Sequence, residues 1–186
     1  KRTSLTLIPQ CGLCKLHLQC NSPKMPVFGK GGKKILIIGE APGREEDQQN
    51  RPFVGQAGQV LQSALRKFGI DMREDTWVTN ALICRPPKNV IEDAKSIDYC
   101  RPNVIKAIKE LQPKTIILLG AVPAKSVMGW LWKENVKGIG TWAGWKIPCQ
   151  KLNAWVCPTF HPSYISREDN KGSDVPRMYF EKHLKA

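Results

Sequence analysis

Two short apolar runs, each ending in glycine, constrain the fold of this chain more than any other feature of its sequence. They read KILIIG over residues 34–39 and TIILLG over residues 115–120. A continuous apolar run of this length is typical of a strand that is covered on both faces of a parallel sheet. Two further strands are predicted over residues 76–84 and 154–160.

Segments with the helical spacing of apolar residues alternate with these strands. They cover residues 57–68, 93–111, 122–132 and 175–184, whereas the aromatic and turn-breaking residues of 135–151 predict a short hairpin or loop. Strands that alternate with helices predict helices on both faces of the sheet. The expected fold is a three-layer α/β/α domain with a central, mainly parallel four-stranded sheet. All 186 residues are expected to form this one domain, with residues 1–33 as an N-terminal arm.

The chain is strongly basic, with 29 Lys and Arg residues against 16 Asp and Glu residues and a net charge of +13. This excess favours a polyanionic partner, since basic side chains release condensed counterions when they neutralise phosphates. A surface that serves solubility, an acidic protein or a membrane is the alternative interpretation. No apolar run approaches the roughly 18 residues of a membrane helix, and the stretch 5–9 is too short for a signal peptide. A cytoplasmic monomer without a membrane partner is expected.

Polar residues of unusual kinds lie where the predicted strands end, which is where open α/β sheets bind ligands. Glu40 follows the first run, Asn80 lies in the second strand, and His161 follows the fourth. An Asn amide in a buried strand needs hydrogen-bond partners, which a pyrimidine edge or a neighbouring loop would supply. Phe53 lies in a loop rich in glycine and proline, where it is either a ligand-binding ring or one more core residue.

The cysteines suggest a metal site. Their odd number, seven, and the lack of a secretory signal argue against a disulfide framework. Cys11 and Cys14 form a C-x-x-C pair in the arm, Cys84 ends the second predicted strand, and Cys100 lies in the helix that follows. Four thiolates from these segments predict binding of zinc or of an iron–sulfur cluster.

Taken together, the motifs resemble those of the family 4 uracil-DNA glycosylases, the iron–sulfur branch of the uracil-DNA glycosylase superfamily. The matching stretches are C-x-x-C at 11–14, GEAPG at 39–43, RPFVGQAGQ at 51–59, TNALICRPP at 79–87, Cys100 and PTFHPSY at 158–164. They follow the family's order over nearly the whole chain. The resemblance implies a monofunctional DNA repair hydrolase. It would cleave the N-glycosidic bond of uracil flipped out of single- or double-stranded DNA and leave an abasic site.

The resemblance also implies roles for particular residues. The ligands of a 4Fe–4S cluster, with zinc as the alternative metal, would be Cys11, Cys14, Cys84 and Cys100. The cluster would order DNA-facing loops and perform no redox chemistry in turnover. Phe53 would stack on the flipped uracil, Asn80 would read its Watson–Crick edge, and His161 would donate to the uracil O2 as charge builds on the departing base.

The remaining site residues are expected from the same motifs. Glu40 would activate water or stabilise the sugar cation, because Ala41 stands where a related branch has an aspartate. Glu46 or the Gly43 backbone would exclude the methyl group of thymine. The substrate-binding set would comprise Gly39, Ala41, Gly43, Glu46, Phe53 and Asn80. The wedge that fills the space left by the base would be one of Tyr164, Ile165 and Arg167, with the apolar Ile165 best suited.

Three cysteines are not part of the expected cluster ligands, and two function classes other than a uracil-DNA glycosylase are alternatives. Cys20, Cys149 and Cys157 are predicted to be buried thiols, with Cys20 near the cluster. A non-catalytic nucleic-acid-binding module with a four-cysteine metal site would explain the charge and the cysteines, but not the polar residues at the strand ends. A phosphate- or nucleotide-using enzyme is disfavoured because the chain lacks GxGxxG and a Walker lysine.

Overall fold

The computed structural model describes residues 11–185, so the first ten residues of the predicted arm lie outside the described part. The protein forms one five-stranded sheet with the order β2-β1-β3-β5-β4. Its strands are β1 (Ile35–Gly39), β2 (Thr76–Asn80), β3 (Thr115–Leu119), β4 (Ile147–Cys149) and β5 (Ala154–Thr159). The first three pairings in this order are parallel, and β4 pairs with β5 in the antiparallel direction. The prediction of a mainly parallel sheet is confirmed.

The predicted strand number, four, is wrong by one, because the short edge strand β4 was not expected. It has only three residues, includes Pro148, and lies in the segment predicted as a hairpin or loop. So short a strand shows no apolar alternation, and its existence depends on pairing with β5. The strand β2 is also shorter than predicted, since it ends at Asn80 and leaves Cys84 in the following loop.

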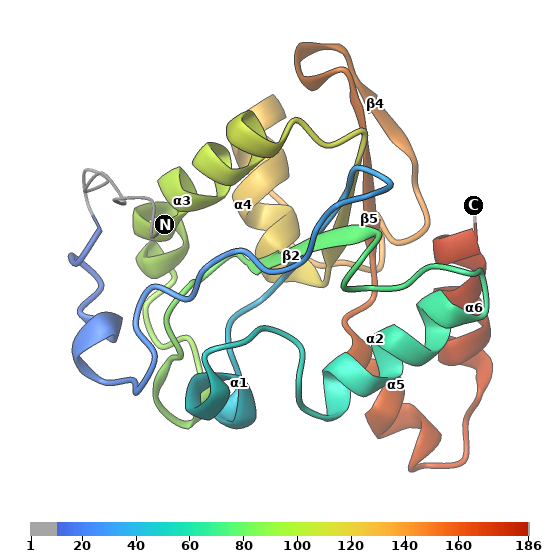
Figure 1. The fold of residues 1–186 in the computed structure, drawn as a ribbon, viewed down its shortest axis with the longest axis horizontal. Helices are drawn as coiled ribbons and strands as arrows, with labels where there is room; N and C mark the ends of the chain where they lie inside the picture. The colour runs from blue at the N-terminus through green and yellow to red at the C-terminus, as the bar shows by residue number, and fades with distance from the viewer. Residues whose placement is uncertain (1–10, 186) are drawn as a thin grey trace.

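Helices cover both faces of the sheet, as the prediction of three layers requires (Figure 1). On one face lie α3 (Lys95–Leu111) and α4 (Ala121–Trp132), and on the other lie α2 (Gln56–Arg66), α5 (Pro162–Asp169) and α6 (Val175–Lys185). A short helix, α1 (Arg44–Gln49), follows the loop after β1. The sequence did not predict α1 or α5, which are short and mostly polar. No helix of residues 11–185 is long and apolar enough to cross a membrane.

The hydrophobic core is divided by the sheet into two parts. Along β1, Leu36 and Ile38 face the cluster beneath α3 and α4, whereas Ile37 faces the cluster beneath α2, α5 and α6. All three side chains are fully buried. The continuous apolar run that predicted this strand therefore reflects burial on both faces.

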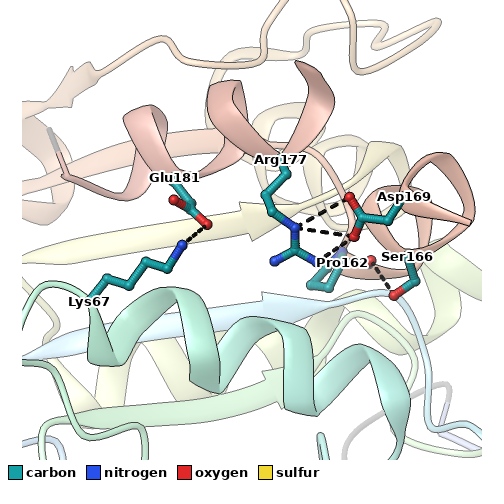
Figure 2. A network of polar contacts seen from close by, with 6 residues as sticks. All are labelled: Lys67, Pro162, Ser166, Asp169, Arg177 and Glu181. Atoms are coloured by element: carbon teal, nitrogen blue, oxygen red, sulfur yellow. Dashed lines mark hydrogen bonds and ion pairs between the residues drawn. The ribbon is translucent and has the colours of Figure 1, made fainter. Parts of the chain in front are cut away.

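Polar contacts lie within and between the helices of the second face (Figure 2). The carboxylate of Asp169 at the end of α5 forms an ion pair with Arg177 of α6, and Lys67 after α2 forms one with Glu181 of α6 at 2.7 Å. The hydroxyl of Ser166 donates to the Pro162 carbonyl within α5 at 3.3 Å. The Asp169–Arg177 pair thus joins the end of α5 to α6, and the Lys67–Glu181 pair joins α6 to the end of α2.

Candidate active site

The strand order creates a crevice between β1 and β3. From β1 the chain crosses to β2 on one side, and from β3 it continues through the edge strand β4 to β5 on the other side. The loops after β1 and β3 therefore diverge, which is the topological switch point where ligands bind in sheets of this kind. A cavity of about 780 Å³ lies there, and it is lined by Glu40 and Ala41 after β1, Gly120 and Ala121 after β3, and His161 after β5.

Phe53 and Asn80 meet over the backbone of Gly39. These residues come from a loop and from the end of β2, and Asn80 pairs in register with Gly39. A Cβ atom added to Gly39 would lie 2.4 Å from Asn80 Oδ1 and 2.6 Å from Phe53 Cζ, so only glycine fits. Phe53 is 5% exposed and Asn80 is 4% exposed, and neither lines the cavity. Two of the predicted base-binding groups thus converge at a point one residue before Glu40.

His161 is held in one orientation at the start of α5. The backbone N–H of Ser163 donates to His161 Nδ1 at 3.2 Å, and the Ser163 hydroxyl lies 2.8 Å from the same nitrogen. A ring nitrogen that accepts an N–H carries no proton, so the neutral ring carries its hydrogen on Nε2. Burial, and secondarily the positive charge of Arg167, lowers the pKa of His161 to about 4. At neutral pH the imidazole is uncharged.

Glu40 lies in the same cavity as His161. Burial raises the pKa of the Glu40 carboxyl above its ordinary value, and the charge of Arg167 opposes this shift. Arg167 also lines the cavity, so its guanidinium acts on both titratable groups. A carboxyl with a raised pKa is a better proton acceptor when ionised than an ordinary carboxylate is.

Glu46 is predicted to form a wall of the base pocket, but its carboxylate contacts the backbone around Gly55 and Gly43 instead. Oε1 accepts the backbone N–H of Gly55 at 2.8 Å, and Oε2 lies 2.6 Å from where a Cβ of Gly43 would stand. Neither Glu46 nor Gly43 lines the cavity. The carboxylate closes the loop from 43 to 55, which carries Phe53.

The prediction that Ile165 is the wedge is wrong. Its side chain is 0% exposed and packs in the core cluster beneath α2, α5 and α6. An amphipathic helix turns its apolar residues toward the core, and the sequence did not predict that α5 is a helix. Of the other two candidates, Tyr164 is half-buried and Arg167 is exposed, and both line the cavity.

The four predicted metal ligands lie around a second, small cavity. Cys11, Cys14, Cys84 and Cys100 all line it. The backbone N–H of Lys24 donates to Cys84 Sγ at 3.2 Å, and that of Ile83 donates to Cys100 Sγ at 3.4 Å. Burial raises the pKa of Cys84 to about 12 and that of Cys100 to about 11. Within residues 11–185 no group of three or more His, Cys, Asp or Glu side chains that could hold a metal ion is found.

The three remaining cysteines lie in separate places. Cys20 packs against the same apolar cluster as Cys84 and Cys100, whereas Cys149 is buried in the core beneath α3 and α4. Cys157 is half-buried, and burial raises its pKa. Sequence reasoning missed two polar residues of the site region, Ser163 and Asp47, whose partners become visible only once α5 and α1 are known to be helices.

Comparison with known proteins identifies the family. A family model described as the uracil DNA glycosylase superfamily matches residues 26–185. The chain belongs to this superfamily. Its three-layer α/β/α fold and the crevice at the ends of β1, β3 and β5 are therefore those of a uracil-DNA glycosylase superfamily member.

Two relatives narrow the position of the chain within the superfamily. It is 37% identical over 172 residues to a protein of Pyrobaculum aerophilum named type-4 uracil-DNA glycosylase, and the match covers 87% of this chain and 82% of that protein. A protein of the same name from Thermotoga maritima is 34% identical over 184 residues, covering 96% of this chain and 88% of the relative. The resemblance to the family 4 glycosylases is confirmed.

Proposed function

We propose that this protein is a DNA repair glycosylase that hydrolyses the N-glycosidic bond of uracil flipped out of DNA and leaves an abasic site. The observation that carries the proposal is the cavity that holds a neutral His161 and a half-buried Glu40 at the crevice between β1 and β3. The names of the relatives and the net charge of +13 support DNA as the substrate.

His161 stabilises the leaving group in this mechanism. Breaking the N-glycosidic bond moves negative charge onto uracil, so a fixed donor aimed at the base lowers the barrier. The Nε2–H of His161 is such a donor, because Ser163 occupies Nδ1. The ring is uncharged in the ground state, so it strengthens its hydrogen bond as the charge on the uracil O2 develops.

Glu40 acts on the other fragment, the sugar. Its carboxylate either takes a proton from the attacking water or faces the oxocarbenium-like cation with its negative charge. Both roles require the ionised form, and Arg167 favours that form against the effect of burial. The wedge is assigned to Tyr164 or Arg167, which line the cavity beside His161.

Phe53 and Asn80 select the base. An aromatic ring stacks on any base, whereas an amide with one acceptor oxygen and one NH₂ group complements the N3–H and O4 of uracil. Cytosine presents the opposite pattern at these two positions, so Asn80 rejects it. The convergence of the Phe53 ring and the Asn80 amide over Gly39 supports placing the base at this point.

The activity is tested with an oligonucleotide that carries a single uracil. After incubation with the protein and heating in alkali, we expect a strand break at the uracil position, and no break when thymine stands there. The break should appear in single-stranded and in uracil–guanine duplex substrates, with flipping easier in the single strand. A wild-type protein that binds this DNA without cutting it would contradict the proposal and favour a nucleic-acid-binding module.

The cysteine cavity is proposed to hold a 4Fe–4S cluster. Four thiols from the arm, the loop after β2 and α3 surround it, and backbone N–H groups point at two of the sulfurs. Thiolates with such donors fit an iron–sulfur cluster, and zinc is the runner-up. When bound, the cluster would cross-link these three segments and so order the loops beside the active-site cavity.

Cys84→Ala is expected to abolish the broad visible absorbance of the purified protein and to lower its soluble yield, because a cluster ligand and a cross-link are lost together. Absorbance spectra and iron analysis measure the effect. Cys157→Ala is the matched control, since Cys157 lies on β5 away from the cysteine cavity and should keep both the colour and the yield. A brown Cys84→Ala protein with full iron content would remove Cys84 from the ligand set.

The rate is expected to fall on acidification as Glu40 takes up a proton. Because burial raises the pKa of Glu40, the fall should begin at a higher pH than for an ordinary carboxyl, while His161 stays neutral until about pH 4. Arg167→Ala removes a charge that lowers the pKa of both groups, so the acidic limb should move to higher pH. Single-turnover rates between pH 4 and 9 test this, and an unmoved limb would exclude Glu40 as its source.

A further inference from the structure

Asp47 of α1 is a buried carboxylate that the mechanism above does not use. Its side chain is 1% exposed. The backbone N–H of Ser22 donates to Oδ1 at 2.8 Å, and the backbone N–H of Asn21 donates to Oδ2 at 3.1 Å. The Asn21 side-chain amide donates to Oδ2 at 3.2 Å, and the Ser22 hydroxyl donates to the Asp47 carbonyl at 2.6 Å. A buried charge with this many donors holds its partners in one arrangement.

The partners of Asp47 adjoin the cysteine-bearing segments. Asn21 and Ser22 lie in the arm directly after Cys20, and Arg85 directly follows Cys84. The guanidinium of Arg85 lies 3.9 Å from Asp47 Oδ2. Asp47 thus fastens α1 both to the N-terminal arm and to the loop after β2.

The neighbouring residue, Glu46, fastens the same helix to the loop of Phe53. Its Oε1 accepts the N–H of Gly55, two residues after Phe53. Phe53 has a φ of 56°, a left-handed conformation that costs free energy for an aromatic residue and persists only where its surroundings hold it. The position of α1 therefore determines where the Phe53 ring lies.

We propose that Asp47 is a positioning residue that couples the cysteine-bearing segments to the base-stacking ring through α1. Asp47 and Glu46 are consecutive residues of α1 whose carboxylates bind different segments. Asp47 binds the arm and Arg85, whereas Glu46 binds the loop that carries Phe53. A shift of the arm or of Arg85 therefore moves the Phe53 loop. The inference rests on the proposed function, because it assigns Phe53 to stacking on the flipped base. Through this coupling the cysteine site influences the position of the Phe53 ring by structure alone, without electron transfer.

Asp47→Asn tests the coupling, because the amide has the same shape but turns one acceptor into a donor that faces the N–H groups of the arm. Stacking holds substrate and transition state alike, so its weakening raises KM and leaves kcat unchanged. We expect KM for uracil-containing single-stranded DNA to rise about tenfold, the effect of losing one hydrogen bond to a charged group. The visible absorbance per protein should stay at the wild-type value.

Two further measurements separate coupling from a merely structural role. Hydrogen exchange of residues 50–56 should speed up in Asp47→Asn, whereas that of α4 should not change. In a Phe53→Leu background, Asp47→Asn should raise KM little further, because both changes act through one ring. Ser22→Ala, which removes only the bond to the Asp47 carbonyl, gives the same test with the carboxylate intact and a smaller rise in KM.

Asp71→Asn is the matched control, since this exposed carboxylate also accepts two backbone N–H groups, those of Arg73 and Glu74, but bonds neither to α1 nor to Asn21 and Ser22 within the described residues. Its KM should equal that of the wild type. A wild-type KM in Asp47→Asn, or an undiminished effect of this change in Phe53→Leu, would overturn the coupling. Failure of the wild-type protein to release uracil would instead overturn the proposed function.

Discussion

His161→Ala is expected to lower kcat about 100- to 1000-fold, the usual cost of removing one preorganised donor from a developing anion. The loss should appear in kcat with little change in KM, because the donor acts mainly on the charge that builds in the transition state. Single-turnover release of uracil at saturating enzyme measures the chemical step without a contribution from product release.

The fold should survive this change. His161 contributes a cap to the first turn of α5, but the ion pair of Asp169 with Arg177 holds the far end of that helix to α6 (Figure 2). Asn170→Ala, an exposed position at the end of α5, is the matched control and should retain the wild-type rate. A His161→Ala protein that keeps more than about a tenth of the wild-type kcat would refute the assigned role. The loss of one such donor is expected to lower kcat at least about 100-fold.

Asn80→Ala is expected to lower kcat/KM for uracil about 100-fold or more, because the base then leaves its N3–H and O4 without partners in a buried site. Unlike the change at His161, this change should also weaken discrimination between uracil and cytosine. Rates of base release from otherwise identical oligonucleotides carrying either base give both quantities.

Thr79→Val provides the control for Asn80. Thr79 precedes Asn80 on β2, is buried and has nearly the volume of valine, but successive residues of a strand face opposite sides of the sheet. Its rate should match the wild type. Equal loss in Thr79→Val and Asn80→Ala would mean that both changes act by disturbing β2, and Asn80 would lose its role in reading the base.

Much of the fold could be predicted from local patterns. The run over 34–39 became β1 because burial on both faces demands apolar residues at every position, and this demand is visible in the sequence itself. The same holds for the helices with an apolar stripe, such as α2 and α3. The elements that were missed, β4, α1 and α5, are short, and their stability comes from contacts with distant segments rather than from periodicity.

The error at Ile165 has the same origin. An apolar residue just after the active-site histidine suits a wedge only if it points outward, and that direction depends on whether the segment is a loop or a helix packed on α2. Arg167 is exposed and lines the cavity, and Tyr164 both lines the cavity and packs against the same core cluster as Ile165. The residue type could be read from the sequence, but the direction in which the side chain points could not.

The sequence by itself determined the fold class, the family motifs and the residue types at the strand ends, because each of these depends on neighbours in the chain. Only the tertiary structure decided that Phe53 and Asn80 meet over Gly39, that Ser163 sets the tautomer of His161, and that Asp47 joins the arm to α1. Such contacts depend on distances of a few ångströms between residues brought together by folding, and no local pattern encodes them.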